Sequence, residues 1–84
     1  LPENDSKEPT FQDERQTNCY RIMMDWGFTS TQARNCAENA DTMKLFFTWK
    51  YNNAIDPAIK EGKLTKKQAQ GMFFGELKKN DLRI

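Results

Sequence analysis

Hydrophobic residues recur every three or four positions in five stretches of the chain, with polar and turn-forming residues between them. This spacing is typical of helices that bury one face. It predicts an all-α fold, a compact orthogonal bundle of four to five short helices, within a single domain over residues 11–80. Residues 1–10 are polar and contain two prolines, which favours a flexible lead-in, and residues 81–84 are left as a tail.

The ends of the first two predicted helices are marked by capping residues. The first helix covers about residues 11–26, with Thr10 as its expected N-cap. Gly27 ends it, because glycine readily adopts the left-handed conformation that closes a helix. The second helix follows a capping box, in which Thr29 and Gln32 bond to free backbone N–H groups at the helix start. Its small residues allow a neighbouring helix to come close: Ala33, Cys36, Ala37 and Ala40.

The third predicted helix is apolar on nearly every side, which is typical of a helix at the centre of a fold. It covers about residues 42–51, and Asp41 is its expected cap. A short fourth helix begins at Asp56-Pro57, with Asp56 as its expected cap and proline in the first turn, and ends before Gly62. The third helix is the expected centre of the core.

The last helix opens with a second capping box, from Thr65 to Gln68. Its expected inner face consists of Ala69, Met72, Phe73 and Leu77. The five helices should pack around a core of large side chains: Trp26, Met43, Phe46, Trp49 and Phe73.

Aromatic residues change the picture of a chain whose hydrophobic share is only 37%. Six Phe, two Trp and two Tyr are present, and each aromatic buries about 150–250 Å². They can therefore close a core in a short chain. Two aromatic pairs, Phe46/Phe47 and Phe73/Phe74, are adjacent, and helical neighbours point about 100° apart. Either one member of each pair faces outward or the core is thick enough to take both; Phe74 is the candidate for an exposed anchor that contacts a partner protein.

The absence of histidine excludes His-ligated metal sites and His-based catalysis. The two cysteines, Cys19 and Cys36, do not stand in an electropositive motif, and no ligands cluster at zinc spacing. No apolar run approaches the roughly 20 residues that span a bilayer. We therefore expect a protein without catalytic residues, metal or cofactor and without a membrane span. The cysteines are compatible either with one disulfide or with two buried thiols.

Charge divides the chain into two unlike halves. Residues 1–42 contain four basic and eight acidic residues, whereas residues 43–84 contain nine basic and four acidic residues. A basic half can contact phosphates, which makes a helical nucleic-acid-binding domain one alternative. A solvated lysine-rich surface is the other interpretation. The lysines concerned are Lys60, Lys63, Lys66, Lys67, Lys78 and Lys79.

The loop Trp26-Gly27-Phe28 joins a short helix to a helix of small residues, and the next helix carries an apolar run that ends in tryptophan. These residues are Ala33, Cys36, Ala37, Met43, Phe46, Phe47 and Trp49. This arrangement over residues 20–50 resembles the ubiquitin-associated (UBA) class of three-helix domains, which has Met in place of Trp26 and Leu in place of Lys50. The resemblance implies ubiquitin binding through the loop and the end of the third helix.

A second set of residues, Trp49, Pro57, Ile59 and Leu64, is similar to the Trp-centred helical core of secreted oomycete effectors.

The sequence as a whole favours a small non-enzymatic protein–protein interaction module. Such a module is either part of a larger protein or a pathogen or phage factor that acts on a host protein. The expected partner contacts are Trp26, Gly27, Phe28 and Phe74. Nucleic-acid binding and UBA-like ubiquitin binding stay open as alternatives.

Overall fold

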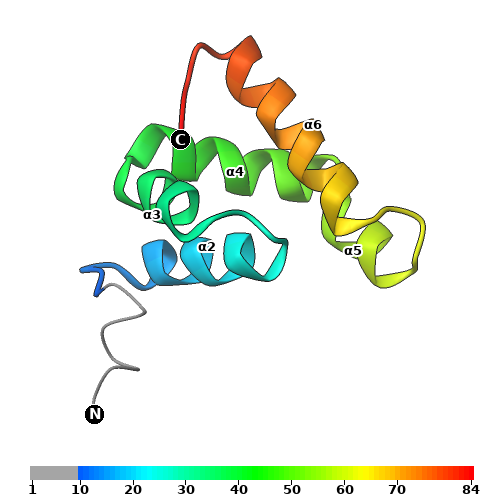
Figure 1. Cartoon of the computed structure of the whole chain (residues 1–84), viewed down its shortest axis with the longest axis horizontal. Helices are drawn as coiled ribbons and strands as arrows, with labels where there is room; N and C mark the ends of the chain where they lie inside the picture. The colour runs from blue at the N-terminus through cyan, green and yellow to red at the C-terminus, as the bar shows by residue number, and fades with distance from the viewer. Residues whose placement is uncertain (1–9) are drawn as a thin grey trace.

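Short capped helices make up most of residues 10–84, the part of the chain that the computed structural model describes. In chain order these helices are α2 (Glu14–Asp25), α3 (Ser30–Glu38), α4 (Ala40–Asn52), α5 (Ile55–Lys60) and α6 (Lys66–Lys79) (Figure 1). Strands do not occur between residues 10 and 84, so the all-α prediction is confirmed. The predicted lead-in, apart from Thr10, lies outside the described residues.

Both predicted capping boxes are present. The Thr29 hydroxyl accepts from the Gln32 backbone N–H at 3.1 Å, and the Thr65 hydroxyl accepts from that of Gln68 at 3.0 Å. In each box the glutamine side chain accepts in return from the backbone N–H of the threonine. These caps explain why α3 and α6 begin where the sequence predicts.

Three other predicted caps were wrong. Helix α5 begins at Ile55 after Ala54, which makes no side-chain cap bond, so Asp56 lies in the first turn and is not the cap. In the other two cases a better-placed residue competes. Helix α2 begins after Asp13 rather than Thr10, since Asp13 forms its own capping box with Gln16. Helix α4 begins after Asn39 rather than Asp41. The Asn39 side-chain oxygen accepts from the backbone N–H groups of Asp41 and Thr42, at 2.9 and 3.3 Å.

Four helices are each followed, two positions after their last residue, by a residue with positive φ: Gly27, Ala54, Gly62 and Asp81. This left-handed residue turns the chain so that the next N–H groups satisfy the last free carbonyls. After α6, for example, the Leu82 N–H bonds to the Leu77 carbonyl at 2.8 Å. Glycine adopts positive φ without cost, whereas alanine does not.

Replacing Ala54 with glycine is therefore expected to raise the free energy of unfolding by about 0.5–1 kcal/mol. Ala54 is exposed and has a φ of 54°. The same substitution at Ala58, inside α5, should lower stability by about 1 kcal/mol. Urea denaturation followed by circular dichroism measures both. Equal losses at the two positions would contradict the proposed role of the Ala54 backbone.

The centre of the fold is a cluster of aromatic rings between α4 and α6. Phe46 lies 5.5 Å from Trp26 and 5.2 Å from Phe73, measured between ring centroids, and Trp49 lies 5.1 Å from Phe73. In Figure 1, α6 runs diagonally past α4, and α2 lies on the other side of α4. The predicted core is confirmed, since all its members are buried: Trp26, Met43, Phe46, Trp49 and Phe73.

Helix α6 buries a narrower face than the sequence predicts. Ala69, Phe73 and Leu77 are buried at intervals of four residues, but Met72 is 45% exposed. The buried residues form one stripe, where α4 packs against α6 and the Phe28 ring of the loop before α3 contacts Phe73. Met72 lies beside the stripe and is left in solvent.

Candidate functional site

The predicted binding loop between α2 and α3 is covered by α6. Trp26 and Phe28 are only 2% and 3% exposed. The Gln70 side chain donates a hydrogen bond to the Trp26 carbonyl, and the Phe28 ring lies against Phe73, 6.1 Å between centroids. We therefore correct the sequence-based interpretation: these two side chains are parts of the core and are closed to a partner in this conformation.

Gly27 has a structural role in that loop. It is exposed, and its φ of 93° closes α2, with the Phe28 N–H bonded to the Met23 carbonyl at 3.1 Å. This turn directs Phe28 back into the core. The Gly-Phe pair that resembles the UBA loop is thus explained by the helix end alone.

Phe74 faces outward, as the sequence predicts, and is 39% exposed. Its ring also lies 5.6 Å from that of Phe28, which fixes it against the body of the domain. Phe74 stands at the edge of a groove of about 320 Å³ between α6 and the C-terminal segment. The lining residues are Phe74, Leu77, Lys78, Asp81, Leu82, Arg83 and Ile84. We call this the C-terminal groove.

The C-terminal segment forms one wall of this groove and is not a loose tail. Asp81, with a φ of 59°, reverses the chain after α6, and Leu82 and Ile84 then pack against the core. Figure 1 shows the segment returning from the end of α6 toward α4. The single domain therefore extends beyond residue 80, because the apolar residues of the segment are buried in part.

The C-terminal groove combines apolar walls with a mainly cationic rim. Leu77 is buried, and Leu82 and Ile84 are half-buried, so hydrocarbon lines the interior. Lys78 and Arg83 are exposed at the rim, together with one carboxylate, that of Asp81. A ligand that brings apolar side chains and a surplus of carboxylates would complement both features.

Three of the six lysines of the predicted phosphate-binding surface lie beside carboxylates. Lys63 pairs with Glu61 at 3.1 Å, and Lys66 pairs with Asp25 at 3.2 Å, between nitrogen and oxygen. In addition, Lys78 and Lys79 lie at the far end of α6, roughly 18 Å from Lys66 at a rise of 1.5 Å per residue. The six lysines therefore form two separate groups, and the first is partly neutralised.

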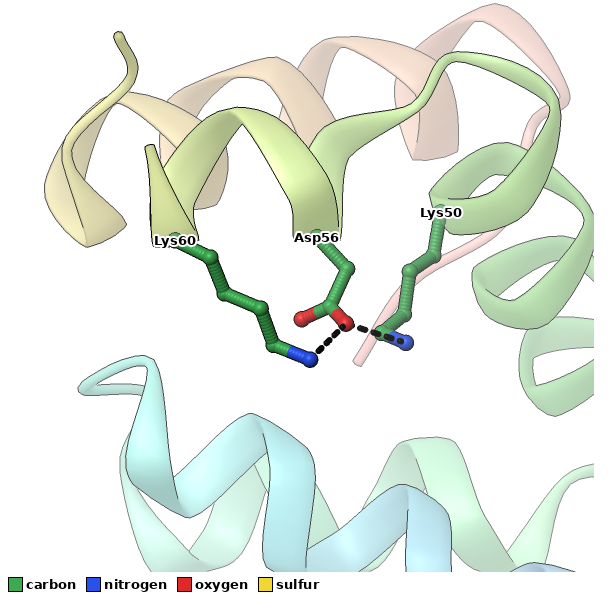
Figure 2. A network of polar contacts seen from close by, with 3 residues as sticks. All are labelled: Lys50, Asp56 and Lys60. Atoms are coloured by element: carbon green, nitrogen blue, oxygen red, sulfur yellow. Dashed lines mark ion pairs between the residues drawn. The ribbon is translucent and has the colours of Figure 1, made fainter. Parts of the chain in front are cut away.

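Asp56 contacts one lysine of this set, Lys60, and a second lysine outside it, Lys50. Figure 2 shows its carboxylate between Lys50 of α4 and Lys60 of α5, with nitrogen–oxygen distances of 3.8 and 3.4 Å. The Lys50 side chain is 5% exposed, whereas that of Lys60 is 76% exposed. The Lys50 ammonium also lies 4.3 Å from the centroid of the Tyr51 ring. Asp56 thus compensates a buried charge and joins α5 to α4.

A second groove, of about 470 Å³, lies between α2 and α4. The Phe47 and Tyr51 rings stack in it at a 10° interplanar angle, and Tyr51 is 64% exposed. The other lining residues are all polar: Arg15, Asn18, Thr48 and Asn52. The sequence left open whether one ring of the Phe46/Phe47 pair faces outward. It did not indicate that the Tyr51 ring would stack on Phe47.

The two cysteines meet inside the domain. The sulfur atoms of Cys19 in α2 and Cys36 in α3 lie 3.7 Å apart, and both residues are fully buried as free thiols. The hydrogen bond between the two sulfurs, in which either sulfur can be the donor, lowers the pKa of Cys36. The same bond, together with burial, raises the pKa of Cys19.

Residues 10–84 contain no group of three or more Cys, Asp or Glu side chains arranged to hold a metal ion. Over the same range, every helix is too short or too polar to cross a bilayer.

No family model matches the chain, and no curated protein or solved structure matches it at a significant level. Inferences about function therefore rest on the residues and contacts described above.

Proposed function

We propose that this protein is a non-enzymatic interaction module that binds an acidic, apolar segment of another protein in the C-terminal groove. One observation carries the proposal: an exposed Phe74 ring, held against Phe28, stands at the edge of an apolar groove with Lys78 and Arg83 at its rim. Aromatic residues and arginine at a groove are the side chains that contribute most to binding energy.

The charge at the rim favours one kind of occupant. A segment with leucine or phenylalanine would place those side chains against Leu77, Leu82 and Ile84. Aspartate or glutamate beside them would lie near Lys78 and Arg83. Complementary charge of this kind speeds association and excludes basic segments. The larger groove between α2 and α4 is a weaker candidate for an apolar segment, since four of its six lining residues are polar.

Selection from a displayed library of random peptides tests the proposal. We expect the selected peptides to be rich in acidic and apolar residues and to bind the Phe74→Ala variant at least tenfold more weakly, as expected for loss of an aromatic anchor. The matched control is Met72→Ala, which removes an exposed apolar side chain of the same helix outside the groove. That variant should bind the selected peptides like the parent protein.

Charge reversal separates this function from nucleic-acid binding. Lys78→Glu together with Arg83→Glu should weaken peptide binding, whereas Lys63→Glu together with Lys67→Glu should not. Selected peptides that are basic, or that bind the Phe74→Ala and Met72→Ala variants equally, would contradict the proposal. Tighter binding of a DNA duplex, with an affinity that falls steeply with salt and is lost in the Lys63/Lys67 variant, would support the nucleic-acid alternative instead.

A further inference from the structure

The contact between the two thiols is a consequence of how α2 and α3 pack. Ala33 and Ala37 flank Cys36 on the buried face of α3, and these small side chains let the two helices approach closely. The approach brings the Cys36 sulfur to 3.7 Å from that of Cys19, with no side chain between them. The proposed binding groove contains neither cysteine.

The two thiols are chemically unequal. The two sulfurs share a hydrogen bond in which either can be the donor; this contact lowers the pKa of Cys36 and, together with burial, raises the pKa of Cys19. A thiolate is the nucleophile in thiol–disulfide exchange. Cys36 is therefore the thiol that reacts first, and Cys19 is placed to react second.

We propose that Cys19 and Cys36 are an oxidation site at which a small disulfide oxidant cross-links α2 to α3. The Cys36 thiolate attacks one sulfur of the oxidant, which forms a mixed disulfide and releases one thiolate. Cys19 loses its proton to solvent and attacks the Cys36 sulfur, which releases the second thiolate. The two cysteines lose two protons and two electrons in total, and the oxidant is reduced to two thiols.

The movement required is small. A disulfide needs a sulfur–sulfur distance of about 2.05 Å, so the two sulfurs must approach by about 1.65 Å from their present contact. Because both thiols are fully buried, the oxidant reaches them only when α3 opens away from α2. We therefore expect oxidation to be slower than that of an exposed thiol and to accelerate in low concentrations of urea.

Incubation of the reduced protein with oxidised glutathione tests this site. Mass spectrometry should find a monomer lighter by two hydrogen atoms, with the peptide of Cys19 joined to that of Cys36. The disulfide joins residues 17 positions apart and should lower the equilibrium constant for unfolding by about a hundredfold. Urea denaturation of the oxidised and reduced forms, with no peptide present, measures that change.

Two single variants give the control. In the Cys19→Ser variant the reaction should stop at a glutathione adduct on Cys36. In the Cys36→Ser variant the adduct forms on Cys19, and it should form more slowly than the Cys36 adduct does. A stable glutathione adduct on the parent protein, a disulfide-linked dimer, or thiols that stay reduced even in low urea would each overturn the proposal. None of these outcomes depends on whether the C-terminal groove binds a peptide.

Discussion

Replacing Phe73 with alanine is expected to lower the free energy of unfolding by about 3–5 kcal/mol. The Phe73 side chain is fully buried, and its ring lies within about 6 Å of three others, those of Phe28, Phe46 and Trp49. Removing it leaves a cavity where α6, α4 and the loop before α3 meet. Because a small domain has only about 5–15 kcal/mol of stability, this loss removes much of it.

The neighbouring phenylalanine provides a matched control for this prediction. Phe74 differs from Phe73 by one position on the same helix but is 39% exposed. Phe74→Ala should therefore cost about 1 kcal/mol or less, since the ring already contacts water. Urea denaturation of both variants compares them directly. Equal losses would show that α6 does not pack through the stripe of Phe73.

The second large effect concerns the buried lysine. Asp56→Asn should lower the free energy of unfolding by about 1–3 kcal/mol, because it leaves the buried Lys50 ammonium without its carboxylate. Lys60→Ala removes the other partner of the same carboxylate. That lysine is 76% exposed, so its loss should cost only about 0.5 kcal/mol.

A rescue variant separates the charge from other effects of Asp56. If the cost arises from the unpaired ammonium, Lys50→Met combined with Asp56→Asn should be more stable than Asp56→Asn alone. Thermal unfolding of the two single variants and the double variant gives the coupling. An additive result would mean that Asp56 stabilises α5 independently of Lys50.

Features that depend on neighbours in the sequence could be predicted from it. The boxes at Thr29 and Thr65 each involve residues three positions apart, and the structure has both. At α4 the pattern indicated Asp41, whereas Asn39, two positions earlier, forms the cap. The outward direction of Phe74 also followed from local helix geometry and is confirmed.

Features that depend on distant contacts could not be predicted. The covering of the loop before α3 by α6 is one of them: the hydrogen bond from the Gln70 side chain to the Trp26 carbonyl joins residues 44 positions apart, and the Phe28 ring lies against that of Phe73. Lysine is normally expected at the surface, so nothing in the sequence indicated that Lys50 would be buried. The C-terminal groove likewise depends on how the segment after Asp81 folds back.

We propose that a partner binds at the C-terminal groove and not at the covered Trp26-Gly27-Phe28 loop. Backbone amide NMR of the labelled protein, titrated with a selected peptide, tests this most directly. We expect the largest shifts at residues 74–84, with Gly27 and Lys63 nearly unchanged. Shifts centred on residues 26–28, or on the lysines between residues 60 and 67, would contradict it.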